Sequence, residues 1–282
     1  MNKRNILYGA IIVICIIAII IAVYHQIFSK KVVNENKINV IENATIDDEP
    51  IIDPKDTLAE FNKLFTNTFD DQNYSKNNIK KIEGLENEDI VYTAYNIKEE
   101  VDEKYSLNVK LPVINIDGNV AAGLNGTTQK IFADKTSSIL SETEKYTIYS
   151  VEYTSYLNDN ILSLVIKSTL KEGNSAQRII VQTYNYDIEN NEEVTLNQVL
   201  DKYQIKTKDV NKKIEQQVKE ASNEATTISQ ATGQIVYKRN LEDSMYTTDK
   251  ASNFFIGKDG QIYIVYAYGN NNVTSEIDII KI

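Results

Sequence analysis

The 282-residue chain contains one histidine, one cysteine and no tryptophan. The histidine is His25, so no imidazole follows it. Serine–histidine and cysteine–histidine nucleophile systems need an imidazole base, and catalytic zinc sites usually need histidine ligands. The sequence also has no HExxH motif, no GxxxxGK[ST] motif and no GxGxxG motif. We therefore predict no catalytic residues, no metal site and no cofactor.

Carboxylate chemistry is the catalytic alternative that these absences leave open. Glycoside hydrolysis uses two carboxylates at a fixed separation across the scissile bond. The candidates are close together in the sequence: Asp187, Glu189, Glu192 and Glu193. Acidic residues beside a turn more often form a solvated edge. A carboxylate-dependent cell-wall hydrolase therefore stays as an alternative to a binding function, as does a structural or regulatory subunit of a membrane complex.

The charge of the chain is strongly negative, at −10 overall. Four of its basic residues, Lys3, Arg4, Lys30 and Lys31, flank an apolar segment, which leaves 26 basic and 40 acidic residues elsewhere. The resulting net charge of −14 repels nucleic acid and would attract a basic protein. The same charge also serves solubility. We expect no nucleic-acid partner.

Residues 6–28 form an almost wholly apolar run, which is long enough to cross a membrane once as a helix. The run is longer than the core of a signal peptide, and no small-x-small cleavage pair follows it. We therefore expect an uncleaved membrane anchor, with residues 1–5 in the cytoplasm. Cys15 lies within this run, so the rest of the chain is free of thiols, as is typical of exported bacterial domains. The prediction is a single-pass protein of the cell membrane with its C-terminal part outside.

The composition changes along the chain in a way that predicts its organisation. Residues 29–56 are polar and acidic and contain two of the three prolines, which favours a flexible linker. Residues 57–100 read as a lead-in with a helix and a strand. Residues 101–144 read as a small αβ subdomain, and residues 145–282 as a C-terminal α+β domain. The abundance of isoleucine, asparagine, lysine and tyrosine is typical of AT-rich genomes, those of low-GC Gram-positive bacteria among them.

Several segments have the periodicity of regular structure. Residues 146–157 and 161–170 alternate around an Asn-Asp-Asn turn and predict a β-hairpin, and residues 178–188 add a third strand. Pro112 places its strand at an edge or a bulge. Thr195 and Gln198 have the spacing of a capping box, which begins a short helix. A longer helix is expected after it, with apolar residues on one face: Val210, Ile214, Val218, Ala221 and Ala225. We predict an α+β fold in which an antiparallel sheet of hairpins carries helices on one face.

The order of segments after Tyr105 resembles a known pair of domains. The matching stretches are YSLNVKLPVIN, YTIYSVEYTSYLNDNILSLVIKS, TYNYDIENNEEVTLNQVL and NFFIGKDGQIYIVYAY. The pair, of unknown function, forms the outer portion of lysozyme-sensing anti-sigma factors of Gram-positive bacteria and precedes the catalytic domain of some peptidoglycan deacetylases. The resemblance implies a binding module for lysozyme or for the cell wall.

Two departures from that family limit what the resemblance implies. Many members have a glycine-rich loop ending in Gly-Ala-His, where this chain has the loop Gly173–Gln177 without histidine. Five residues before the apolar run are too few for a cytoplasmic sigma-binding segment, and no deacetylase domain follows. We therefore expect a binding module without an effector. Its predicted partners are a cationic protein such as lysozyme, or peptidoglycan, with the membrane held by the N-terminal helix.

We expect the partner to contact two loops and two tyrosines. Tyrosine is abundant in the predicted strands, and although most such rings pack within a sheet, some can serve as amphipathic anchors. The predicted partner-binding residues are Gly173, Asn174, Ser175, Tyr266, Tyr268, Gly269, Asn270, Asn271 and Asn272.

Overall fold

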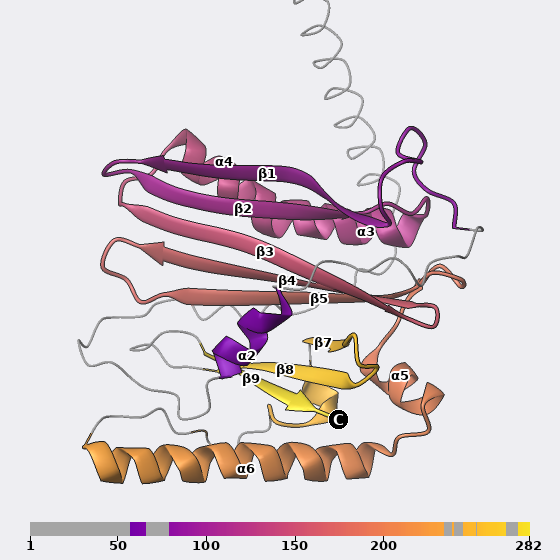
Figure 1. The fold of residues 1–282 in the computed structure, drawn as a ribbon, viewed down its shortest axis with the longest axis vertical. Helices are drawn as coiled ribbons and strands as arrows, with labels where there is room; N and C mark the ends of the chain where they lie inside the picture. The colour runs from indigo at the N-terminus through magenta and orange to yellow at the C-terminus, as the bar shows by residue number, and fades with distance from the viewer. Residues whose placement is uncertain (1–56, 66–78, 234–238, 240–244, 252, 269–275) are drawn as a thin grey trace, which may run out of the picture. The chain divides into compact units, whose positions relative to one another are not determined.

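A six-stranded sheet and a three-stranded sheet, with helices packed against both, make up the described part of the chain (Figure 1). The structure is a computed structural model that describes residues 57–65, 79–233, 239, 245–251, 253–268 and 276–282. The first sheet consists of β1 Val91–Val101, β2 Tyr105–Ile114, β3 Thr147–Asn158, β4 Ile161–Glu172, β5 Arg178–Asp187 and β6 Glu192–Glu193. The second consists of β7 Asn253–Ile256, β8 Ile262–Tyr268 and β9 Glu276–Lys281. The helical elements are α2 Thr57–Leu64, α3 Asn119–Thr128, the π-helix η2 Gln129–Ala133, α4 Asp134–Ser141, α5 Leu196–Lys202, α6 Thr207–Thr232 and the 3₁₀-helix η3 Thr248–Lys250.

The strands of the first sheet follow their order in the chain, but they are not all antiparallel. β3, β4 and β5 form the predicted antiparallel hairpins, and Asp159 in the tight β3–β4 turn has a φ of 53°. β2 and β3, however, run parallel, with Tyr105 opposite Thr147 and Val109 opposite Val151. The helical stretch between these strands crosses over the sheet, which is the connection that parallel neighbours require. The fold class is α+β as predicted, but the sheet is mixed, so the prediction of a purely antiparallel meander is wrong.

Pro112 lies at a β-bulge, which was one of the two positions expected for it. The register between β1 and β2 shifts between Thr93 and Tyr95, and Pro112 is paired with Thr93. The parallel pairing of β2 with β3 extends only over residues 105–109. Pro112 therefore interrupts no ladder on that side of the strand, where its missing N–H would have been needed.

The first sheet is covered on both faces, which corrects the expectation of helices on one face. β4 shows why, because its side chains alternate between two layers and both sets are buried. Leu162, Leu164 and Ile166 belong to a core that includes Leu124 and Phe132 from the α3–η2 helical stretch. Val165 belongs to another core, which it shares with Phe61 of α2 and with side chains of the second sheet.

The second sheet packs on α5 and α6. The predicted apolar face of α6, formed by Val210, Ile214, Val218, Ala221 and Ala225, is buried. Its first three members share a core with side chains of β7, β8 and β9. The capping box that opens α5 is present: the Gln198 backbone N–H donates to the Thr195 hydroxyl, and the Thr195 backbone N–H donates to the Gln198 side chain.

Side chains of the first sheet form hydrogen bonds with the backbone along the outer edge of β7, where no other described strand pairs with it. Asn185 Nδ2 donates to the Phe254 carbonyl at 2.8 Å, and the Phe254 N–H donates to the Thr183 hydroxyl at 3.1 Å. The Ile256 N–H donates to Ser163 Oγ at 3.0 Å, and Ser163 Oγ donates to Asn185 Oδ1 at 2.7 Å. This polar seam (Ser163, Thr183 and Asn185) joins the two sheets through hydrogen bonds that must be made because the groups are buried.

The sheet extends across an expected domain boundary. Residues 101–144 and 145–282 were expected to form separate units, yet β2 pairs with β3 and both contribute to one core. The predicted segments 1–5, 6–28 and 29–56 lie outside the described residues. Among the residues that the structure does describe, no helix has the length and hydropathy that crossing a membrane requires.

Candidate functional site

The predicted binding loop at Gly173, Asn174 and Ser175 is a short connection between β4 and β5. Gly173 has a φ of 56°, a left-handed conformation that favours glycine. Its N–H donates to the Tyr146 carbonyl at 2.8 Å, and the Ser175 N–H donates to the Glu172 carbonyl at 3.0 Å. Asn174 is exposed and its two neighbours are half-buried. The loop is therefore held in one shape at its base, and it presents the Asn174 side chain to solvent.

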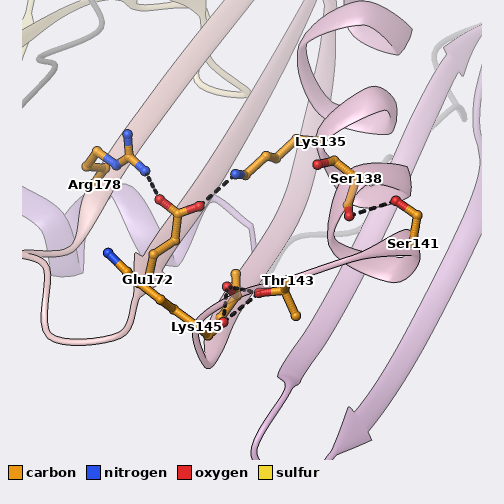
Figure 2. Close-up of polar contacts among 8 residues, drawn as sticks. Lys135, Ser138, Ser141, Thr143, Lys145, Glu172 and Arg178 are labelled. Atoms are coloured by element: carbon orange, nitrogen blue, oxygen red, sulfur yellow. Dashed lines mark hydrogen bonds and ion pairs between the residues drawn. The ribbon is translucent and has the colours of Figure 1, made fainter.

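Glu172, at the base of this loop, lies among three cations from different parts of the chain. Lys135 of α4 donates to Glu172 Oε1 at 2.8 Å, and Arg178 Nη2, at the start of β5, is bonded to Oε2 (Figure 2). Lys145 lies beside the same carboxylate, and its side chain passes over Gly173. We call Lys135, Lys145 and Arg178 the cationic cluster. It carries three positive charges around one negative charge, within a chain whose net charge is −10.

Hydroxyl groups fix the backbone from which Lys145 projects. Thr143 Oγ1 and Thr147 Oγ1 both donate to the Lys145 carbonyl, and the two hydroxyl oxygens lie 3.0 Å apart (Figure 2). Ser141 Oγ donates to the Ser138 carbonyl at 3.0 Å, next to the end of α4. The connection from α4 to β3 is therefore braced by its own side chains, and this holds the base of Lys145 next to the loop.

The cationic cluster changes the acidity of Glu172. Partial burial raises the pKa of its carboxyl, but the hydrogen bond from Lys135 and the charges of Lys135, Arg178 and Lys145 lower it more. The net effect holds this pKa below its ordinary value of 4.5. A carboxyl whose pKa is lower in the folded state stabilises the fold above its unfolded pKa, and that contribution is lost as the pH falls through the folded pKa.

An acid titration of stability follows from this shift. Between about pH 6 and about pH 3, the wild-type chain should lose more free energy of unfolding than Glu172→Gln, because the variant has no carboxylate to protonate. Urea unfolding at several pH values measures the difference. If the two proteins lose stability in parallel over this range, the ion pairs of Glu172 do not stabilise the fold.

The predicted anchor Tyr266 is a core residue, which corrects its assignment as a surface contact. Its side chain is 3% exposed, it packs edge to face against Tyr246, and its hydroxyl donates to the Thr247 carbonyl at 2.9 Å. Burial raises the pKa of its phenol. Tyr268 ends β8, opposite Glu276, and its side chain is not described. Gly269, Asn270, Asn271 and Asn272 lie outside the described residues.

The carboxylates considered for hydrolysis lie at the other end of the β3–β4 hairpin. Asp187 ends β5 opposite Ile161, and it accepts hydrogen bonds from the Glu189 N–H at 2.9 Å, the Asn190 N–H at 3.0 Å and Asn190 Nδ2 at 2.9 Å. Partial burial raises its pKa, but the bonds from Asn190 and Glu189 and the charge of Lys202 outweigh this and lower it. Asp187 therefore acts as the acceptor that shapes the β5–β6 turn.

Other acidic side chains converge on the same end of the sheet. Glu192 is opposite Asp187 and Glu193 is opposite Tyr186 across the short β5–β6 pairing. Asn160, in the β3–β4 turn, is bonded to Glu189. Lys202 of α5 lies 3.9 Å from the Asp159 carboxylate. We call this region the acidic end and define it by its carboxylates, with Lys202 among them: Asp159, Asp187, Glu189, Glu192, Glu193 and Asp201.

The titration behaviour of the acidic end does not single out an acid–base pair. Desolvation raises the pKa of the Glu193 carboxyl, whereas that of Asp187 is lowered. Opposite pKa shifts in two neighbouring carboxyl groups are typical of an acid and a base. Here, however, the hydrogen-bond donors around Asp187 hold its carboxylate within its own turn. Asp187 is also offset by one residue from Glu193 across the strands. In the part of the chain that the structure describes, no group of three or more histidine, cysteine, aspartate or glutamate side chains is arranged to hold a metal ion.

The cationic cluster is the feature that reasoning from the sequence did not find. The hairpin pattern brings Glu172 close to Arg178, because both flank a five-residue loop. The contributions of Lys135 and Lys145 depend instead on the crossover between β2 and β3. A strand–helix–strand order in residues 105–158 was a usable signal for that crossover, and it places the end of the helical stretch beside the start of β3.

Comparison with known proteins finds structural similarity but no match to a family model and none to a curated protein. One similar structure is a DUF3298 family protein from Pseudomonas aeruginosa PAO1, with 9% identity and a TM-score of 0.40, over 68% of this chain and 86% of that one. Another is a DUF3298 family member from Bacteroides fragilis NCTC 9343, with 14% identity and a TM-score of 0.37, over 68% and 89% of the two chains. DUF3298 denotes a domain of unknown function, and at these scores the similarities carry no argument about activity.

Proposed function

We propose that the chain is a membrane-anchored, extracytoplasmic binding module without catalytic activity, whose partner is a cationic protein of the cell envelope such as lysozyme. The observation that carries the proposal is the acidic end, which places six carboxylates around two neighbouring turns and α5. A surface of this kind attracts a basic protein and raises the rate at which it associates, in a salt-dependent way.

The structural roles at this end support binding rather than hydrolysis. Asp187 is committed to three donors of its own turn, so its carboxylate is part of the backbone architecture. Glu192, Glu193 and Asp201 are exposed, and a partner can reach them. The resemblance of the sequence to the outer portion of lysozyme-sensing anti-sigma factors supports lysozyme as the first protein to test.

Neutralising exposed carboxylates at the acidic end should weaken lysozyme binding. The variant Glu192→Gln/Glu193→Gln/Asp201→Asn removes three negative charges, each worth roughly 0.5 kcal/mol at a solvated rim, so the dissociation constant should rise roughly tenfold. The matched control is Glu215→Gln/Glu220→Gln/Glu224→Gln on α6, which removes the same charge from another exposed surface. Binding is measured with the full-length chain at low and moderate salt.

Two outcomes would contradict the proposal. If both triple variants weaken binding equally, the attraction depends on net charge and not on the acidic end. If lysozyme with acylated, neutralised lysines binds as well as native lysozyme, charge does not select the partner. Labelled lysozyme added to intact cells tests the location in the same experiment, because an extracytoplasmic domain binds it before the cells are lysed and a cytoplasmic one only afterwards.

A further inference from the structure

The cationic cluster has more hydrogen-bond donors than Glu172 uses. A guanidinium has five N–H donors and an ammonium has three. Arg178 bonds Glu172 through Nη2, and Lys135 bonds it through Nζ. The ammonium of Lys145 is exposed and makes no hydrogen bond or ion pair of 4.0 Å or less within the described residues. Donors from all three side chains therefore remain available to a second acceptor.

Cations also outnumber the carboxylate at this place. Lys135 and Arg178 share Glu172, and the charge of Lys145 acts on the same carboxylate without forming an ion pair with it. Lys135, Arg178 and Glu172 are each about one-third exposed, so an incoming group can reach them without unfolding the loop. The chain as a whole is acidic, so a cluster of three cations is a place where an anion can be attracted.

We propose that Lys135, Lys145 and Arg178 form a binding site for a phosphate group, which lies against Glu172 between Lys145 and Arg178. A phosphate anion is complementary to three cations that surround a single carboxylate, and guanidinium and ammonium groups are the side chains that proteins use for phosphate. The braced backbone at Thr143 and Thr147 fixes the base of Lys145, so part of the ordering cost of binding is already met.

Glu172 has a defined role in this site. In the free protein its carboxylate holds Lys135 and Arg178 in place. When phosphate binds, the same carboxylate competes with it for the donors of these two side chains. Its charge repels the ligand, so removing the charge should tighten binding even though it loosens the cluster. A purely structural ion-pair network predicts the opposite sign, because there every substitution would only weaken the site.

Titration of the full-length chain with inorganic phosphate at low ionic strength tests the proposal. We expect a dissociation constant on the order of 1 mM for the wild type. Lys145→Gln should raise it about tenfold, and Glu172→Gln should lower it about threefold. The hydrogen bonds that Lys145 accepts are made by its backbone carbonyl and persist in the variant, so loss of the side-chain charge should leave the unfolding temperature nearly unchanged. The control Lys213→Gln, on the exposed face of α6, should change neither quantity.

Three arms separate the sources of the phosphate: inorganic phosphate, poly(glycerol phosphate) and detergent micelles that contain phosphatidylglycerol. Tighter binding of the polymer assigns the site to a phosphodiester chain, tighter binding of the micelles assigns it to a lipid headgroup, and equal binding assigns it to the free ion. The proposal is overturned if none of the three binds, or if Lys145→Gln and Lys213→Gln behave alike. Lysozyme binding at the acidic end is measured separately, so failure of one proposal leaves the other standing.

Discussion

Phe255→Ala should lower the free energy of unfolding by about 3–5 kcal/mol, because its side chain is 0% exposed and the cavity cannot close easily. Phe255 of β7 is stacked against Tyr263 at 4.9 Å between ring centroids and against Tyr156 of β3 at 6.1 Å. Phe61 of α2 belongs to the same core. The substitution therefore removes contacts with both sheets and with the helix that precedes them.

Urea unfolding of the full-length chain measures this effect, with Phe65→Ala as the matched control. Phe65 is only partly buried and packs at the margin of the same core, so its loss should cost less than half as much. We expect one cooperative transition that moves to lower urea with an unchanged slope. Two separate transitions in the variant would mean that the sheets do not depend on this core for each other's stability.

The elements that the sequence predicted best are those defined by local chemistry. The β3–β4 hairpin follows from alternation on either side of Asn158-Asp-Asn160, and α6 follows from apolar residues at helical spacing. The capping box at Thr195 requires only two side chains three residues apart. In each case the interactions that select the structure lie within a few residues of one another.

The features that local patterns alone do not predict depend on contacts between distant segments. The parallel pairing of β2 with β3 is set by where the helical crossover returns the chain, and periodicity does not encode this. The burial of Tyr266 depends on β8 packing against α6 and Tyr246, whereas its alternating pattern fits an exposed ring equally well. The cationic cluster needs three segments to meet, so no spacing rule reveals it.

The two proposed binding surfaces lie at opposite ends of one strand. β4 begins at Ile161, beside the acidic end, and ends at Glu172, within the cationic cluster. Eleven residue steps along a strand span about 36 Å, which is several Debye lengths at physiological salt. The two regions are therefore electrostatically independent, and a basic protein and a phosphate group can be bound at the same time.

The polar seam is the second place where one substitution should have a large effect. Asn185 is 3% exposed, donates to the Phe254 carbonyl and accepts from Ser163 Oγ. Asn185→Leu leaves two buried groups without this partner, so the free energy of unfolding should fall by about 2–4 kcal/mol. The same change at Asn223, exposed on α6, should stay within about 0.5 kcal/mol.

A double-mutant cycle shows whether the seam acts as a unit. Ser163 donates to Asn185 and accepts from the Ile256 N–H, so the two side chains share one network across the sheets. Combining Ser163→Ala with Asn185→Leu should cost less than the two separate losses together, by about 0.5–3 kcal/mol, because the second substitution removes a bond that the first has already broken. Strict additivity in urea unfolding would show that each hydrogen bond stabilises β7 independently, and the sheets would then be joined mainly by the apolar core around Phe255.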